Sequence, residues 1–227
     1  MAKIVMIGTY HLDPDGEERL TERLTEIAPD IVICEGRPEK QLGYESKIEM
    51  FRQRLPASGL SRSRQRKLLD LELRPNFEER GSRKFCETKG IPFFWFGDSC
   101  KELTEQEGEE QVRLTIEKCK TLNPDHIIEA LRQGANRQYT GLKNAMDTTL
   151  EPFIFLQEGY YASIVEEGFG PRDREMEDFL RPKLAKYPNA TIATVNGFNH
   201  ILRDPQGLSL YCRIRNLNPQ RRLWYSV

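Results

Sequence analysis

The sequence predicts an α/β fold, with a mostly parallel central sheet flanked by helices, a helical insertion between the early strands and a β-hairpin at the C-terminus. Short apolar runs rich in β-branched or aromatic residues occur at residues 3–9, 30–35, 90–96 and 190–196. Runs of this length and composition are typical of strands buried on both faces of a sheet. Segments with helical spacing of apolar residues separate these runs, and such alternation favours parallel pairing.

The first strand, a helix and the second strand follow one another within the first 35 residues. The helix begins after Asp13 and Pro14, carries apolar residues at helical spacing, and is closed by Pro29. Parallel neighbours place their carboxyl ends side by side. We therefore expect His11, after the first strand, and Glu35, at the end of the second, to lie at the same edge of the sheet.

Helical character dominates about residues 40–90 and 101–187. We interpret these segments as a helical insertion within one α/β domain that spans residues 1–227. In the second segment we expect two helices divided at Asn123–Pro124, the second of them ended by Gly134.

The last predicted feature of the fold is a β-hairpin at an edge of the sheet. Residues 208–214 and 222–225 alternate in the manner of strands, and Asn218–Pro219 lies between them.

The overall charge gives no reason to expect nucleic acid as a partner. The chain has 34 basic and 35 acidic residues and a net charge of −1, so it has no strong global field. The stretch from Arg52 to Lys67 is basic and contains no acid. It is interpreted as a solvated helical face, with a cover over an anionic ligand as the alternative.

Export and membrane insertion are not predicted. A single short apolar run precedes Gly8, and no stretch reaches the ~18 apolar residues of a membrane helix. The five cysteines are scattered and form no C-x-x-C pair, which suits a reducing compartment. We expect a cytoplasmic protein whose partner is a small-molecule or peptide ligand.

A Gly-x-x-His motif occurs twice, each time directly after a predicted strand, as Gly8 to His11 and Gly197 to His200. The glycine would let the chain leave the strand sharply, so that the ring points into a cleft. Ligands of open α/β sheets bind outside the carboxyl ends of the strands, where we expect both rings. Taken alone, each ring could instead be a satisfied core histidine. The third histidine, His126, has no local partner and is expected at the surface.

Two carboxylates, Glu35 and Asp98, follow strands that end at the same predicted edge. Imidazoles and carboxylates together can activate water in two ways. Histidine can act as a general base oriented by a carboxylate. Alternatively, His11, Glu35 and His200 can hold one divalent ion, for which Mn, Fe, Co or Zn is suited. The residues predicted to contact the substrate are Gly8, Asp98, Asp173 and Gly197.

Several common sites are disfavoured because their motifs are absent. The sequence has no Gly-x-Gly-x-x-Gly after a strand, no Walker-type Gly-Lys-Ser/Thr, no Gly-x-Ser-x-Gly and no His-Glu-x-x-His. Dinucleotide, ATP, serine-hydrolase and thermolysin-type sites are therefore not expected.

Four motifs in order carry a resemblance to a known family. They are Gly8-Thr-Tyr-His11, Pro29-Asp-Ile-Val-Ile-Cys-Glu35, Arg172-Asp-Arg-Glu-Met176 and Val195-Asn-Gly-Phe-Asn-His200. Together they resemble the TraB/PrgY/Tiki group of the erythromycin esterase and ChaN-like superfamily. The match covers both ends of the chain and leaves about residues 40–165 unsupported. The sequence lacks the membrane helices of TraB-type members and the export signal of Tiki and ChaN proteins.

The resemblance implies an α/β fold and a hydrolytic site at His11, Glu35, Arg172 and His200. Arg172 would bind a substrate carboxylate or phosphate, or stabilise an oxyanion. The leading hypothesis is a hydrolase that acts on a peptide, ester or phosphoester. The alternative is a binding protein that uses the same cleft for a small ligand without chemistry. Relatives in that superfamily that bind haem, and the lack of a recognisable nucleophile, motivate this alternative.

Overall fold

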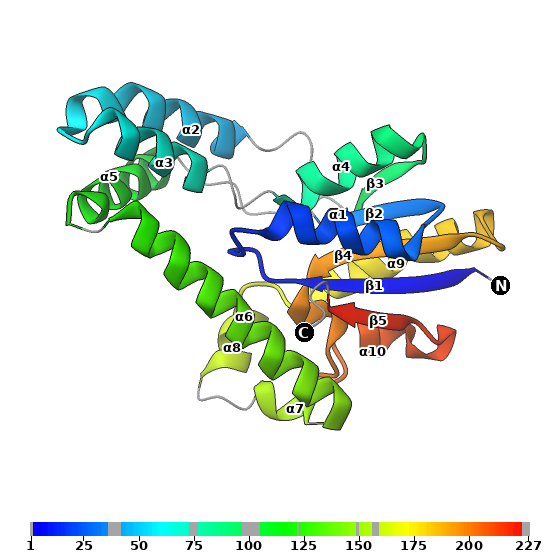
Figure 1. The fold of residues 1–227 in the computed structure, drawn as a ribbon. Coiled ribbons are helices and arrows are strands. Elements are labelled where there is room, and N and C mark those ends of the chain that lie inside the picture. The colour runs from blue at the N-terminus through cyan, green and yellow to red at the C-terminus, as the bar shows by residue number, and fades with distance from the viewer. Residues whose placement is uncertain are drawn as a thin grey trace.

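A five-stranded parallel sheet forms the centre of the molecule (Figure 1). The computed structural model describes residues 2–35, 42–72, 77–96, 105–121, 123–148, 150–155 and 159–223. The strands are β1 (Lys3–Thr9), β2 (Ile31–Glu35), β3 (Phe93–Phe96), β4 (Thr191–Gly197) and β5 (Gln220–Leu223). Their order is β3-β2-β4-β1-β5, and each neighbouring pair is parallel. The predicted α/β class with a parallel sheet is therefore confirmed.

The two N-terminal strands are not neighbours, contrary to the sequence-based expectation. β4 lies between them and pairs with β1 on one side and β2 on the other. The register places Gly8 opposite Asn196 and Cys34 opposite Val195. Because all three strands are parallel, the carboxyl ends of β1, β4 and β2 still meet at one edge of the sheet. The segment after β4 enters this edge between the other two.

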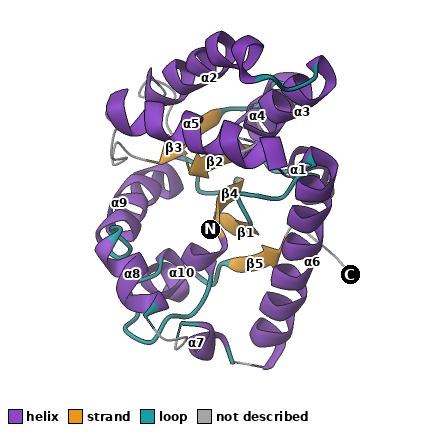
Figure 2. Ribbon diagram, turned by 90° about the vertical axis from the view of Figure 1, so that its left-hand side faces the viewer, coloured by secondary structure: helices purple, strands orange, loops and turns teal. Residues whose placement is uncertain are grey.

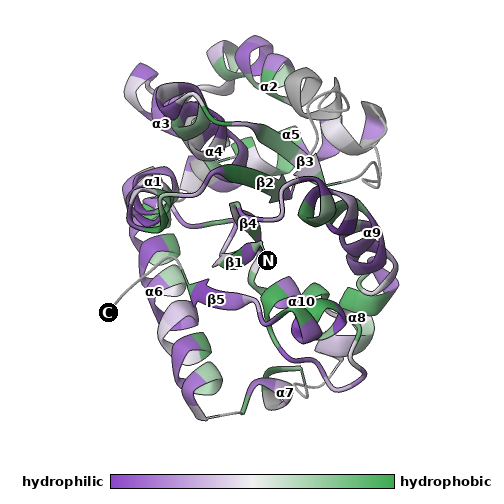
Figure 3. Cartoon of the chain, turned by 90° about the vertical axis from the view of Figure 1, so that its right-hand side faces the viewer, coloured by the Kyte–Doolittle hydropathy of each residue, from purple (hydrophilic) through white to green (hydrophobic). Residues whose placement is uncertain are grey.

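Helices cover both faces of the sheet, as predicted. Figure 2 shows α1 and α6 on one side and α9 and α10 on the other, and Figure 3 shows the same layers from the opposite direction. The α-helices are α1 (Gly16–Ile27), α2 (Leu42–Arg54), α3 (Arg62–Glu72), α4 (Phe77–Lys89), α5 (Glu105–Thr121), α6 (Pro124–Thr148), α7 (Glu151–Ile154), α8 (Tyr160–Glu166), α9 (Pro171–Lys186) and α10 (Leu210–Ile214). The described residues also include the 3-10 helices η1 (Leu55–Ser58), η3 (Phe198–Ile201) and η4 (Arg215–Leu217). Among the described helices, none combines the length and the apolar character required to cross a membrane.

The main core lies on the two faces of the sheet. The strand residues Ile4, Met6, Ile33 and Val195 are at most 2% exposed, as expected for parallel strands covered on both sides. On α1, Leu20 and Leu24 are completely buried, which gives this amphipathic helix its contact face.

The insertion contains a second apolar cluster of its own. Figure 1 shows α2, α3 and α5 at one end of the molecule, from which α6 runs back along the sheet. The buried residues of this lobe are Phe51, Leu55, Leu60, Leu68, Val112 and Ile116. Arg54 and Lys67 from the basic stretch pair at its surface with Glu109 and Asp125. These contacts agree with the interpretation of the stretch as a solvated helical face.

Gly134 does not end a helix, in contrast to the prediction. It lies inside α6, which continues to Thr148. A glycine inside a helix costs only about 1 kcal/mol relative to alanine. The buried residues Ala135, Tyr139 and Leu142 extend the apolar face of α6 beyond the glycine, and this packing maintains the helix.

The predicted C-terminal hairpin is also wrong in its pairing. Residues 210–214 form α10, where the Ser209 hydroxyl accepts a hydrogen bond from the Cys212 N–H at 3.2 Å. Leu210 and Ile214 are buried one helical turn apart, so the pattern that suggested a strand also fits a helix. The final strand, β5, does lie at the edge of the sheet, but it pairs in parallel with β1. Residues 224 and 225 of the predicted hairpin lie outside the described residues.

The Gly8→Ala substitution tests the packing of η3 against β1. A Cβ atom at residue 8 would stand 2.4 Å from Cδ1 of Ile201, which is completely buried. We expect overpacking to lower the free energy of unfolding by about 1–3 kcal/mol, measured by urea denaturation. Ile201→Val removes the clashing Cδ1, so the double variant should be less destabilised than the sum of the two single variants. Simple additivity would contradict this account.

Candidate active site

His200 is buried between two carboxylates. It belongs to η3, directly after β4, and its side chain is 9% exposed. Its Nδ1 lies 2.8 Å from Oδ1 of Asp173, and its Nε2 lies 3.4 Å from Oε1 of Glu35. Asp173 is held in turn by the backbone N–H groups of Leu210 and Gly170, at 2.5 and 3.2 Å. These bonds fix the position of the ring from both sides.

Glu35 connects the ends of two strands and the start of α9. Its side chain is 6% exposed at the end of β2, and Oε2 accepts a hydrogen bond from the Gly197 N–H at 2.7 Å. Oε1 lies 2.7 Å from Nη2 of Arg172, which is in the first turn of α9 after Pro171. Gly170, with φ at +99°, provides the left-handed backbone from which α9 begins. A buried carboxylate needs such partners, because an isolated charge is very costly away from water.

His11 follows β1 and has a more exposed position. Its side chain is 54% exposed, and Nδ1 lies 2.8 Å from Oε1 of Glu78 on α4, a carboxylate that is itself only 6% exposed. A Cβ atom at residue 197 would stand 2.8 Å from Nε2 of His11 and 3.6 Å from Oε2 of Glu35. Gly197 is therefore required by the close approach of these two side chains, and not by an unusual backbone conformation.

Residues of α6 fix the turn that carries His11. The Tyr10 N–H donates to Oη of Tyr139 at 2.7 Å. Arg132 forms two hydrogen bonds with Asp15, at 2.7 and 3.0 Å. A turn held at both ends by one helix has little freedom, so the His11 backbone is preorganised.

The charges of the site stabilise one another. Burial disfavours the charged form of His200, but Glu35 and Asp173 outweigh it and raise its pKa to about 10. Burial likewise opposes ionisation of Glu35, but His200 and Arg172 hold its pKa well below the usual range. For His11, burial opposes protonation while Glu78 outweighs it, which raises the pKa to about 9. Water screens part of this last effect because the His11 ring is half exposed.

A pocket with a volume of about 340 Å³ opens beside these rings. It is lined by residues 10–12 after β1, residues 197–200 after β4, Gln138 from α6 and Tyr160 from α8. Volumes of ligand sites range from about 300 to 1,000 Å³, so this pocket has the size for a small molecule. It lies where the carboxyl ends of the strands predict a ligand.

The structure brings together four of the predicted site residues, and Asp173 joins them. His11, Glu35 and His200 meet around Gly197, and Arg172 binds Glu35. Asp173 is completely buried against His200, so its contact with a substrate stays a prediction.

The other predicted contact residues are placed differently. Gly8 is in contact range of Ile201 and lies in the packing of η3. Asp98 lies outside the described residues. Arg172 does not line the pocket among the described residues, so its contact with a substrate anion also stays a prediction.

The predicted metal set fits an ion in part. Both histidines have Nδ1 against a carboxylate, Glu78 or Asp173, which is the usual outer-shell arrangement of metal-binding histidines. However, both oxygens of Glu35 already have partners. In the part of the chain that the structure describes, no group of three or more His, Cys, Asp or Glu residues is arranged to hold a metal ion.

Sequence reasoning missed the site residues that come from the insertion: Glu78, Gln138, Tyr139 and Tyr160. Glu78 is in the first turn of α4 next to Glu79, where acids are common because they favour the helix N-terminus. The sequence therefore contained no signal to separate Glu78 from an ordinary helix-start acid. Its burial and its contact with His11 appear only in the fold.

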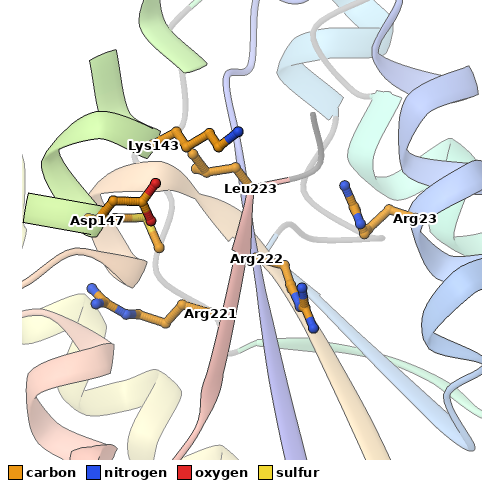
Figure 4. Close-up of a pocket in the computed structure, with 7 residues that line it drawn as sticks. Arg23, Lys143, Asp147, Arg221, Arg222 and Leu223 are labelled. Carbon is orange, nitrogen blue, oxygen red and sulfur yellow. The ribbon is translucent and has the colours of Figure 1, made fainter. Parts of the chain in front are cut away.

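A second pocket, of about 170 Å³, shares no lining residue with the first. Figure 4 shows Arg23 and Arg222 on one side of the end of β5, with Lys143, Asp147 and Arg221 on the other. Arg221 forms an ion pair with Glu151, and Arg23 forms one with Glu26. The pocket is basic, but its described lining residues offer no imidazole or thiol for proton transfer or nucleophilic attack.

Comparisons with known proteins give no further guide to the site, because no family model, curated protein or solved structure was found to match the chain.

The His200→Gln substitution tests the buried ion chain. The folded pKa of His200 is about 10, against an unfolded value of ~6.5. The stability from its proton is therefore fully present below pH ~6.5 and is lost as pH rises through about 10. We expect the variant to be less stable by about 3–5 kcal/mol near pH 6, because two buried carboxylates lose their partner. The difference should shrink toward pH 10.

Urea unfolding of both proteins across this pH range measures the difference. His126→Gln, at an exposed position of α6, is the control and should change stability by no more than about 0.5 kcal/mol. A difference between wild type and His200→Gln that does not vary with pH would exclude the ion chain as its source.

Proposed function

We propose that this chain is a hydrolase that activates water at His11 for attack on an ester, peptide or phosphoester. The observation that carries the proposal is the pairing of His11 Nδ1 with the buried Glu78, while Nε2 lies against Gly197 and the His11 residue lines the pocket. A carboxylate on one ring nitrogen orients the imidazole so that the other nitrogen can accept a proton. The motif resemblance to the TraB/PrgY/Tiki group supports the same reaction class.

For a carbonyl substrate, the proposed reaction has two steps. Nε2 of His11 takes a proton from water as the water oxygen bonds to the carbonyl carbon. The bond to the leaving group then breaks, and the leaving group takes the proton from His11. Glu35, Arg172 and His200 form a chain of ion pairs that provides fixed charges at this edge of the sheet.

No cysteine chemistry enters the proposal. Cys34 lies next to Glu35 but is completely buried. Burial raises the pKa of this thiol well above its usual value, whereas a nucleophilic cysteine needs a thiolate that is accessible. Water is therefore the proposed nucleophile.

The second candidate is a protein that binds a ligand in the same pocket without chemistry. The observation in its favour is that Arg172, His200 and the Gly197 N–H already engage Glu35. Glu35 is therefore not proposed as a proton acceptor, and the chemistry would depend on His11 alone. The pocket volume fits a small molecule better than a haem or a folded peptide. A stoichiometric ligand found by native mass spectrometry, together with no turnover, would favour this candidate.

The Glu78→Gln and His11→Ala substitutions test the hydrolase proposal. His11 must lose its proton before it can accept one, so kcat/KM in an ester, peptide and phosphoester screen should rise with pH toward about 9. Glu78→Gln removes the charge that raises this pKa, and the rising limb of the pH profile should move down in pH toward the ordinary ~6.5. His11→Ala should lose about 10²–10⁴-fold in rate.

His126→Ala is the matched control, because it removes an exposed histidine that lies outside the pocket lining. It should leave the rate and the pH profile unchanged. Turnover that persists undiminished in His11→Ala would reject His11 as the base.

The metal-dependent form of this proposal has its own test. His11, Glu35 and His200 would hold Mn, Fe, Co or Zn, which would supply a bound water of lowered pKa. Protons compete for both rings, whose pKa values are about 9 and 10, so metal affinity should rise with pH over this range. Elemental analysis and titration calorimetry with Mn and Zn measure it. Full turnover after chelation, with no metal detected, would leave the general-base form.

A further inference from the structure

The walls of the pocket beside His11 are mostly apolar. Tyr10 and Phe198 stand on its two strand-end segments with ring centroids 6.5 Å apart. Leu12 also lines it and is 48% exposed. Tyr160 adds a third ring from the insertion. An aromatic or short aliphatic group would therefore be well covered here, since burial of apolar surface is the main favourable term in such pockets.

Polar residues also line the pocket: His11, His200, Gln138 and Asn199. The His11 ring has its Nε2 against Gly197, which lines the same pocket. Oδ1 of Asn199 accepts a hydrogen bond from Tyr160 Oη at 2.9 Å. The Asn199 amide nitrogen can donate to a ligand, as can the amide of Gln138.

The pocket has no acidic lining residue and no lysine or arginine among the described residues. Glu35, Glu78 and Asp173 contact the rings but do not line the space. A cationic ligand would meet imidazole in place of a carboxylate. A multiply charged phosphate would lack the basic side chains that normally bind it, and the second pocket is the one that has them (Figure 4).

We infer that this pocket binds a small aromatic or short aliphatic carboxylic acid, or the acyl group that gives such an acid, with its carboxyl end at His11 and its apolar body against Tyr10, Phe198 and Leu12. The inference rests on the proposed function for the acyl part alone. Hydrolysis of R–CO–X by water gives R–COOH and HX, so the acid would be the product and the acyl compound the substrate. Binding of the acid requires no turnover.

A carboxylic acid suits the nitrogen at this end in either proton arrangement. One proton lies between Nε2 and a carboxyl oxygen, whether the pair is written as a neutral ring with an acid or as a charged ring with a carboxylate. The second carboxyl oxygen can accept from the Asn199 amide. An amine offers no acceptor for either group once it is protonated.

The insertion would then select the substrate while the strand ends perform the chemistry. Gln138 and Tyr160 come from α6 and α8 and line the same space as His11. Substitutions at these two positions should change which acyl group is preferred.

The experiment measures binding of benzoate, benzylamine and phenyl phosphate to the full chain by titration calorimetry. We expect benzoate to bind at least about tenfold more tightly than the other two, a difference of ~1.4 kcal/mol. Leu12→Asp places a carboxylate beside the pocket and should weaken benzoate by about fivefold and strengthen benzylamine. Leu150→Asp makes the same change at a 52% exposed leucine that does not line the pocket, and should leave both affinities unchanged.

The outcomes separate this inference from the proposed function. Benzoate binding that is weakened by Leu12→Asp, in a protein without turnover, would support the pocket assignment and reject the hydrolase. Turnover of an aryl ester that Leu12→Asp does not affect would reject the pocket assignment and retain the hydrolase. Equal affinity for benzoate and benzylamine, no benzoate binding, or equal effects of the two aspartate variants would overturn the inference.

Discussion

The buried carboxylate of Glu35 is the group on which the geometry of the site depends. It joins the end of β2 to the Gly197 N–H at the end of β4, and it binds Arg172 at the start of α9. His200 completes its surroundings. A carboxylate that is 6% exposed is tolerated only if its partners are in place. The same contacts therefore fix the relative positions of β2, β4 and α9. They also hold His200 close to Gly197, against which the His11 ring lies.

The edge of the sheet on which the site lies could be predicted from the sequence, but the order of the strands could not. Apolar runs and the residues that end them are local features, so the strand ends at His11, Glu35 and His200 could be predicted from the sequence. Strand order depends on which surfaces pack best in three dimensions. The pairing of Gly8 with Asn196 joins residues from opposite ends of the chain, and no local pattern encodes it. The pairing of β4 with β1 brings the two Gly-x-x-His segments side by side at this edge.

Residues supplied by the insertion were beyond sequence reasoning for a different reason. Glu78, Gln138 and Tyr160 are ordinary helix residues in composition and spacing, and their roles arise only from where α4, α6 and α8 are placed. The C-terminal segment shows the related problem of a pattern with two solutions. Leu210 and Ile214 suit either a strand or a single helical turn, and the Ser209 cap together with packing against the core decides in favour of the helix.

The two Gly-x-x-His motifs have the same sequence pattern and different physical consequences. Gly8 makes room for Ile201 in the core, whereas Gly197 makes room for the His11 ring itself. His200 has carboxylates at both nitrogens, so its proton is held firmly and the ring acts as a buried positive charge. His11 has one carboxylate at Nδ1, and its side chain is half exposed and lines the pocket. Burial and, to a smaller extent, the positive charge of His200 oppose protonation of His11, but Glu78 outweighs them and raises the pKa of His11 to about 9. The two rings therefore differ because they are buried to different extents. The His200 ring contributes a fixed positive charge, and the His11 ring is the one proposed to exchange a proton.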